Sequence, residues 1–230
     1  MPTKRFLLPI VSFLGLASLT IHGAHHRTPI FADDFEGRTK IGKDYVTALA
    51  GTDAWTIKDG VLIGKQTNPE HGAVIRKELP FRDINIEVDF RFSGGSRFNF
   101  VIDDKNEKSV HAGHICRLSI SPNSLKISDD KTGGMNLKVR AQRQDNNLPE
   151  KKKKALDNLL GRTTSSAKLA LKKDQWYHLR VRIQGDLMEA YIDSKLVASL
   201  RSPGIAHPTK TKFGPTVNDA TIDFDNLKVY

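Results

Sequence analysis

INIEVDFRF, at residues 84–92, alternates apolar and polar side chains without a break. A β-strand points successive side chains to opposite faces, so this segment has one apolar face and one polar face. The apolar face comprises Ile84, Ile86, Val88, Phe90 and Phe92, and the polar face comprises Asn85, Glu87, Asp89 and Arg91. The pattern predicts a strand that packs one side on a hydrophobic core.

The same period of two recurs on both sides of this stretch. FNFVID (98–103) follows a Gly94-Gly95 turn, and further alternating segments lie at 54–64, 124–130, 176–200 and 220–230. Asp59-Gly60, a strong hairpin signal, divides the first of these, and Gly185-Asp186 and Asp193-Ser194 divide 176–200 into three strands. Many short strands without alternating helices predict an all-β protein, an antiparallel sandwich of two sheets.

One segment departs from this pattern. LPEKKKKALDNLLG (148–161) has Pro149 near its start and Gly161 past its end, which predicts one short helix in a long loop between strands. Its run Lys151–Lys154 is either an anion-binding patch or a solvated helix face, and the solvated face is the commoner case. We find no internal repeat and expect a single domain.

Residues 1–24 have the layout of a signal peptide. Lys4 and Arg5 form a positive start, and residues 6–21 are mostly apolar. The apolar run is short for a spanning helix, so cleavage is favoured over the alternative of a retained anchor. We therefore expect residues 25–230 to be exported, to the periplasm or outside the cell, with no transmembrane segment after cleavage.

The chain is basic, with a formal net charge of +10, which falls by two if residues 1–24 are removed. A basic exported protein suits acidic glycans or anionic surfaces, and nucleic acid is not an expected partner outside the cytoplasm. Cys116 is the only cysteine, so no intramolecular disulfide can form.

The order of the segments resembles a known family. WTIKDGVLIG, LPFRDINIEVDFRF, HAGHICRLSI, DQWYHLRVRIQGDLMEAYIDSKLVAS and IDFDNLKVY follow one another as in the bacterial 3-keto-disaccharide hydrolase-like domain, often labelled similar to family-16 glycoside hydrolases. The resemblance covers roughly residues 30–230. It implies a concanavalin A-like jelly-roll sandwich, a sugar-related role at the cell envelope, and action on glycosides whose C3 hydroxyl has been oxidised to a ketone.

HAGHICRLSISP (111–122) gathers two histidines, the cysteine and an arginine. Strand alternation places His114 and Cys116 with the apolar residues, so we expect them to face the core. A metal site at that pair would need ligands that this strand does not supply. His111 and Arg117 fall on the opposite, polar face, and we take these two as candidate catalytic residues.

Other strands add polar residues by the same alternation. The candidate substrate-binding residues are Glu87, Asp89, Arg91, Asn99, Asp103, Asp130, His178 and Arg180. On a shared sheet they would line a groove whose carboxylates and arginines hydrogen-bond sugar hydroxyls. The alternative is a solvated sheet with cross-strand ion pairs. Trp55 and Trp176 head apolar segments, so we expect them to be core or strand-start residues rather than platforms for stacking sugars.

The Glu87-x-Asp89-x-Arg91 pattern argues against family-16 chemistry. Those hydrolases carry a second glutamate where Arg91 stands, and retaining hydrolysis needs two carboxyl groups about 5 Å apart. The resemblance implies different chemistry, in which a base removes the C2 proton beside the ketone, an electrophile stabilises the enolate, and the C1 leaving group departs.

Two choices in this chemistry stay open. The base is His111 or a carboxylate, and the electrophile is Arg117 or a bound divalent cation. The turn that contains Asp129, Asp130 and Lys131 either helps to hold a metal or sugar or simply caps a strand end. His207, in a loop, is a weaker candidate. Two other functions fit the same sequence: a non-catalytic glycan-binding protein, and an envelope adhesion protein that uses its lysine run.

Overall fold

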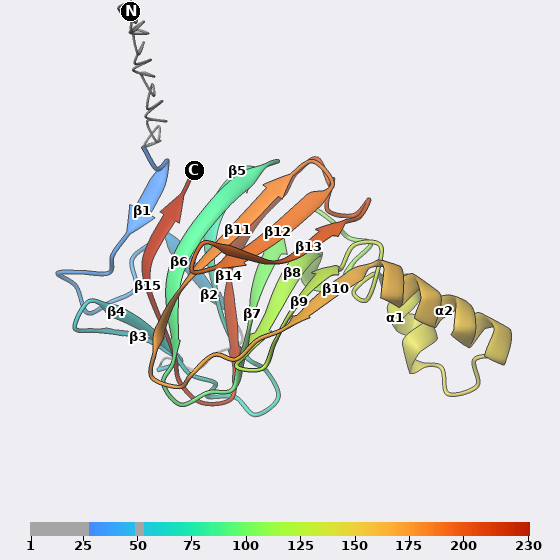
Figure 1. The fold of residues 1–230 in the computed structure, drawn as a ribbon, viewed down its shortest axis with the longest axis horizontal. Coiled ribbons are helices and arrows are strands. Elements are labelled where there is room, and N and C mark those ends of the chain that lie inside the picture. The colour runs from blue at the N-terminus through green and yellow to red at the C-terminus, as the bar shows by residue number, and fades with distance from the viewer. Residues whose placement is uncertain (1–27, 49–52) are drawn as a thin grey trace, which may run out of the picture.

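The computed structural model describes residues 28–48 and 53–230. These residues form two antiparallel sheets packed face to face, with two helices that project from one edge (Figure 1). The expected signal peptide, residues 1–24, lies outside the described residues. No helix in the described part of the chain is long and apolar enough to cross a membrane.

Sheet A is the eight-stranded sheet. Its strand order is β13-β12-β11-β6-β15-β4-β3, and β1 pairs with β15 beside this path. Its strands are β1 (Phe31–Asp33), β3 (Trp55–Lys58), β4 (Val61–Gly64), β6 (Ile84–Phe92), β11 (Trp176–Gln184), β12 (Leu187–Ile192), β13 (Lys195–Arg201) and β15 (Ile222–Val229).

Sheet B is the seven-stranded sheet, in the order β10-β9-β8-β7-β14-β5-β2. Its strands are β2 (Tyr45–Ala48), β5 (Ala73–Phe81), β7 (Arg97–Asp103), β8 (His114–Ser121), β9 (Ser124–Asp129), β10 (Thr164–Lys168) and β14 (Lys210–Asn218). The chain passes repeatedly between the sheets, and both are antiparallel, so the predicted jelly-roll sandwich is confirmed.

The core lies between the sheets and follows the predicted alternation. The five apolar residues of β6 are at most 5% exposed, while its four polar residues are half-buried on the outer face. Phe98 of β7 joins the two sheets, since its ring centroid lies 5.1 Å from that of Phe90 and 5.2 Å from that of Phe224. Each buried aromatic contributes about 1.5–3 kcal/mol by leaving water, so this alternation supplies much of the drive to fold.

The predicted hairpins are also confirmed. Asp59 and Gly60 take the left-handed conformation, with φ of 52° and 74°, and join β3 to β4. Asp193 and Ser194 do the same between β12 and β13, with φ of 49° and 67°. Two consecutive residues at positive φ match the twist of the paired strands, which explains why these dipeptides mark turns.

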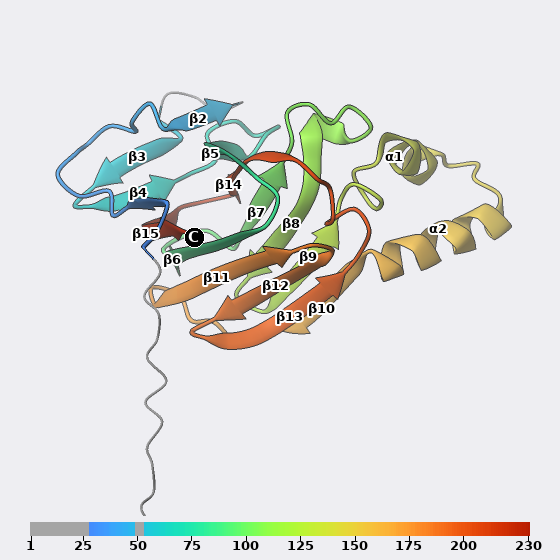
Figure 2. The same ribbon diagram turned by 90° about the horizontal axis from the view of Figure 1, so that it is seen from above.

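The expectation of a single helix at 148–161 was wrong in two respects. A first helix, α1 (Leu137–Gln144), precedes α2 (Glu150–Arg162), and α2 runs through Gly161 to Arg162. The Asn136 side chain caps α1 by accepting from the Lys138 and Val139 amides. Both helices lie between β9 and β10 and form an arm that projects from the sandwich (Figure 2).

Candidate functional site

Five ionisable side chains meet on the outer face of sheet B, at one end of its central strands. Arg76 comes from β5, Asp103 from the end of β7, His114 and Arg117 from β8, and Asp130 from the turn after β9. Arg76, Asp103 and Asp130 are at most 3% exposed, although they lie on the side away from the core. Buried charges are retained only when they are paired, so their partners reveal how this cluster is built.

A β-bulge places His114 in the cluster. Ile102 pairs with Cys116 and Asp103 pairs with His114, so Ile115 is an extra residue in β8. Ile115 and Cys116 are both fully buried, while His114 turns to the same face as Arg117. The expectation that His114 and Cys116 form a core-facing pair was therefore wrong for His114 and right for Cys116.

Asp103 fixes the orientation of the His114 ring. Its carboxylate accepts from Arg76 Nε at 2.8 Å and contacts His114 Nδ1 at 2.6 Å. Burial alone would raise the pKa of Asp103, but the hydrogen bond to His114 and the charge of Arg76 outweigh it and hold that pKa below its ordinary value. An ionised Asp103 accepts a hydrogen bond from Nδ1–H, which leaves Nε2 as the nitrogen available to accept a proton.

The Arg76 guanidinium reaches across β14 at a glycine, Gly214. It donates to the Pro215 carbonyl at 2.8 Å and to the Ile75 carbonyl at 2.9 Å, besides Asp103. Gly214 lies next to it, and a Cβ there would sit 2.5 Å from the Ile75 oxygen. The bare backbone at Gly214 therefore lets β5 and β14 approach where the guanidinium crosses.

Asp130 is a buried carboxylate without a hydrogen bond. Neither of its oxygens has such a partner among the described residues, and Arg117 Nη2 is 3.4 Å from Oδ1, an ion pair only. Burial raises the pKa of Asp130 to about 6, while the charge of Arg117 opposes the shift. The side chain is thus poised to change its charge near neutral pH beside Arg117.

His111 borders this cluster from outside the strand. It begins a 3-10 turn, His111–Gly113, and is exposed, so the expectation that it lies on a strand with Arg117 was wrong. Its ring centroid is 5.9 Å from that of His114. Partial burial lowers the pKa of His111, and the nearby charge of Arg140 lowers it further, which favours the neutral ring.

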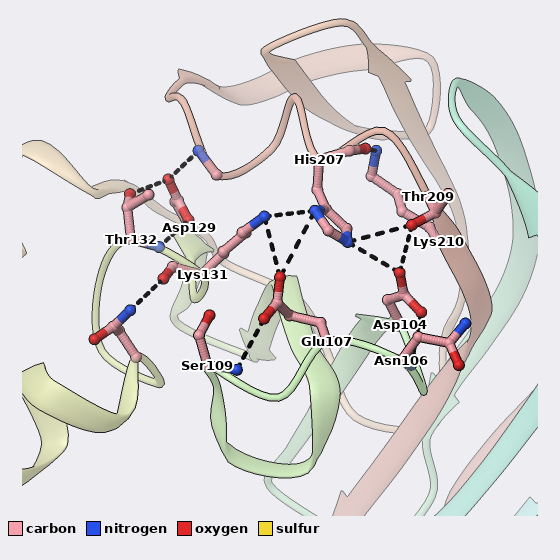
Figure 3. A network of polar contacts seen from close by, with 12 residues as sticks. Asp104, Asn106, Glu107, Ser109, Asp129, Lys131, Thr132, His207, Thr209 and Lys210 are labelled. Carbon is pink, nitrogen blue, oxygen red and sulfur yellow. Dashed lines mark hydrogen bonds and ion pairs between the residues drawn. The ribbon is translucent and has the colours of Figure 1, made fainter.

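A second polar network braces the turn that carries Asp130 (Figure 3). Lys131 Nζ lies 2.5 Å from His207 Nδ1 and 3.2 Å from Glu107. His207 Nε2 lies 2.9 Å from Asp104, which also accepts from Thr209. From the sequence, His207 and Lys131 are separate candidates. Their contact joins two loops that are far apart in the sequence, so no local pattern could predict it.

Asp129 ties the same turn to the loop after β13. It accepts from the Thr132 amide and hydroxyl (Figure 3), and also from the Ser202 hydroxyl and the Gly204 amide. Asp129 is fully buried, so its bonds replace the water that it loses on folding. The two roles considered for this turn therefore belong to different residues. Asp129 and Lys131 connect loops, whereas Asp130 faces Arg117.

Five of the predicted substrate-binding residues lie on the opposite side of the molecule. These residues of β6 and β11 occupy the outer face of sheet A: Glu87, Asp89, Arg91, His178 and Arg180. The single expected groove is therefore two faces separated by the core. The structure brings Asp103, Arg117 and Asp130 together, with His111 beside them, and leaves Asn99 farther along sheet B in contact with Ser119 and Asn218.

On sheet A most of these residues pair with charged neighbours, although Arg180 Nε is buried without a hydrogen-bond partner among the described residues. His178 Nδ1 lies 2.7 Å from its cross-strand partner Asp89, and Arg91 Nη2 lies 2.7 Å from Asp223. The Arg91 guanidinium carbon also lies 4.7 Å from the ring centroid of Trp176. Trp176 starts β11 and is half-buried on this outer face, whereas Trp55 starts β3 and is buried in the core, so both fit the expected core or strand-start positions.

The described residues contain no group of three or more histidine, cysteine, aspartate or glutamate side chains arranged to hold a metal ion. The divalent cation remains a prediction.

Solved structures support the fold. The chain resembles a laminarinase from Rhodothermus marinus (TM-score 0.60, 11% identity, 88% of this chain and 96% of that one). It also resembles SCLam, a non-specific endo-beta-1,3(4)-glucanase of family GH16 (TM-score 0.59, 8% identity, 88% and 90%). A third similar structure is carbohydrate-binding module CBM66 from Bacillus subtilis (TM-score 0.53, 16% identity, 81% and 94%).

At these identities the likeness establishes the architecture alone. Among curated protein sequences, none matches the chain. The family comparison is more specific, because it covers residues 31–230, nearly the whole of the described structure. The chain therefore belongs to the family of 3-keto-alpha-glucoside-1,2-lyase-like domains.

Proposed function

We propose that the protein is a carbohydrate-active enzyme that cleaves 3-keto-glycosides by elimination, with or without later addition of water. The observation that carries this proposal is His114. Asp103 holds its Nδ1 at 2.6 Å, and its Nε2 has no hydrogen-bond partner among the described residues. This is the arrangement of a general base whose tautomer and direction are fixed in advance.

The proposed reaction uses the acidity of the C2–H bond beside the C3 ketone. His114 Nε2 takes the C2 proton, and the bond electrons form the enolate, whose C3 oxygen accepts from the Arg117 guanidinium. The enolate then re-forms the ketone with a C1–C2 double bond as the C1–O bond breaks. The proton on His114 passes to the departing oxygen, which leaves as an alcohol. Asp130 balances the Arg117 charge while no substrate is present.

Positioned bases typically supply a rate factor of about 10²–10⁴. We therefore expect His114→Ala to reduce the turnover of 3-keto-glucosides by about that factor. His178→Ala is the matched control, because it removes a similar histidine–aspartate pair from sheet A and should leave turnover nearly unchanged. His111→Ala tests the alternative base, and a loss confined to that variant would move the proton transfer from His114 to His111.

The assay follows released sugar from 3-keto-glucosides and from their unoxidised parents, with and without a chelator. Cleavage of the keto compounds alone supports elimination, and chelator sensitivity adds the divalent cation as an electrophile. The likeness to a carbohydrate-binding module favours a second candidate function, glycan binding without catalysis. Binding of these sugars without cleavage of any would select that function and remove the catalytic roles of His114 and Arg117.

We also propose that the protein is exported, on the evidence of the signal-like residues 1–24. N-terminal sequencing of the protein recovered from cells tests this. A start at or next to residue 25 agrees with cleavage, whereas a start at Met1 contradicts it.

A further inference from the structure

A polar pocket lies at the end of sheet B away from His114. It has a volume of about 650 Å³ and is lined by Gln66, Ser96, Arg97, Ser121, Asn218 and Asp219, among others. Arg97 starts β7 and Asn218 ends β14, its neighbour, so the pocket belongs to the same sheet as the His114 cluster. The pocket is open to solvent and no catalytic role is assigned to it.

The pocket and the His114 cluster share one face of one strand. Arg97 and Asp103 lie on the outer side of β7, six residues apart. At about 3.3 Å per residue this separation is roughly 20 Å. A disaccharide does not cover that distance, but an oligosaccharide laid along the strand does.

The central strands β7 and β14 carry short side chains on the outer face between the two ends. Gly214, Val101 and Arg117 form one cross-strand row, and Thr216, Asn99, Ser119 and Lys126 form the next. Ser119 donates to Asn99, which donates to Asn218 in the pocket wall. The row of Thr216, Asn99 and Ser119 offers hydrogen bonds to a chain laid along the strand, and Arg117, in the Val101 row, lies at the end of this surface beside His114.

Hydrogen bonds between its own residues hold the pocket wall in place. Asp219 takes a left-handed conformation, with φ of 89°, its amide donates to Gln66 at 2.7 Å, and its carboxylate accepts from Ser96 at 3.2 Å. Arg97 is exposed and forms no ion pair with any described residue. An arginine and a carboxylate with hydroxyl and amide groups between them suit neutral vicinal hydroxyls, whereas the carboxylate disfavours a phosphate or sulfate.

We propose that this pocket is a second sugar subsite, which binds a distal residue of an oligosaccharide whose oxidised residue lies at His114. The placement of the oxidised residue rests on the proposed function. The subsite itself requires only that the outer face of sheet B bind a glucan chain. It would direct the enzyme to oligosaccharides in preference to disaccharides.

The test measures binding of unoxidised malto- and laminari-oligosaccharides, from disaccharide to hexasaccharide, by titration calorimetry on the mature chain. We expect the affinity in at least one series to rise about tenfold with length, which corresponds to 1.4 kcal/mol. Arg97→Ala and Asp219→Asn should abolish the rise and leave disaccharide affinity unchanged, and Asn at 219 tolerates the left-handed backbone. Arg162→Ala, at the end of α2, is the charge-matched control and should keep the rise.

Affinity that does not increase with length in either series, absence of binding included, overturns the subsite. A rise that survives both pocket variants also overturns it. Turnover of 3-keto-glucosides is measured separately on the same preparations. If length-dependent binding is retained while no keto compound is cleaved, the subsite stands and the proposed function fails.

Discussion

Among the described residues, two histidines contact an aspartate through Nδ1, and they lie on opposite sheets. The two rings differ in the surroundings of Nε2. His178 Nε2 lies 3.8 Å from Glu87, and its side chain is 40% exposed, so both ring nitrogens lie near carboxylates at the surface. His114 has a side chain that is 18% exposed and lies beside the Arg117–Asp130 pair. The proposed mechanism therefore assigns the base to His114, beside Arg117, and not to His178.

Asp130 gives a prediction at this same scale. Its pKa rises from 3.8 to about 6 in the folded protein, so its contribution to stability is complete below about pH 4 and is lost as the pH rises through 6. Relative to Asp130→Asn, the wild type should lose about 3 kcal/mol over that window.

Denaturant unfolding of both proteins at a series of pH values measures this loss. The difference between their free energies of unfolding should shift in favour of the variant from pH 4 to pH 7 and then level off. A difference that is constant with pH would show that Asp130 does not titrate in this range.

At the scale of elements, β14 depends on Gly214. Its φ is 149°, and an added Cβ would lie 2.5 Å from the Ile75 oxygen, a backbone atom that cannot turn aside. We expect Gly214→Ala to lower the free energy of unfolding by about 2 kcal/mol or more, because the β5–β14 pairing must shift. It should also disturb the Arg76–Asp103 contact and so reduce turnover.

Gly161→Ala is the matched control. Gly161 lies within α2, and an added Cβ meets nothing within 4 Å. Alanine is the better helix former there, so this variant should be more stable by about 0.5–1 kcal/mol. Equal effects of the two glycine substitutions in chemical denaturation would refute the steric account of β14.

The sequence was sufficient for the strands whose alternation is unbroken. β6, β11, β12 and β13 were predicted from their period of two and their turn dipeptides. β14 was missed because Gly214-Pro215 interrupts the pattern, and α1 was missed because it buries only Val139. The bulge at Ile115 leaves no mark in the sequence, and a shift of one residue reversed the predicted side of His114.

Sequence-based prediction of the candidate site failed for a reason that concerns the whole molecule. Alternation correctly placed Asp89 and Asp103 on polar faces, but it carries no information on which sheet a strand joins. β6 and β7 are consecutive in the chain, yet they belong to different sheets. The predicted groove therefore combined residues from both outer faces. The contacts that join Arg76 to Asp103 and Lys131 to His207 depend on folding over long sequence separations.

The topology also predicts how the molecule folds. The last strand, β15, lies between β6 and β4 in the middle of sheet A, and its Ile222, Phe224 and Val229 are at most 1% exposed. A chain that ends at residue 221 should therefore fail to fold, because sheet A loses a central strand and splits. Far-UV circular dichroism and amide dispersion by NMR check this, and a native-like spectrum of the truncated chain would contradict it.

The helical arm offers a place to attach a reporter. The chain leaves the sandwich after β9 and returns in β10, which pairs with β9, and the Asp129 amide donates to the Thr163 carbonyl at 2.9 Å. The detour thus begins and ends at one point, and the loop at 145–149 between its helices is mostly exposed. A fluorescent protein spliced into that loop would leave both sheets continuous. It would reveal where cells send this protein while both termini, including the segment expected to be cleaved, keep their natural sequence.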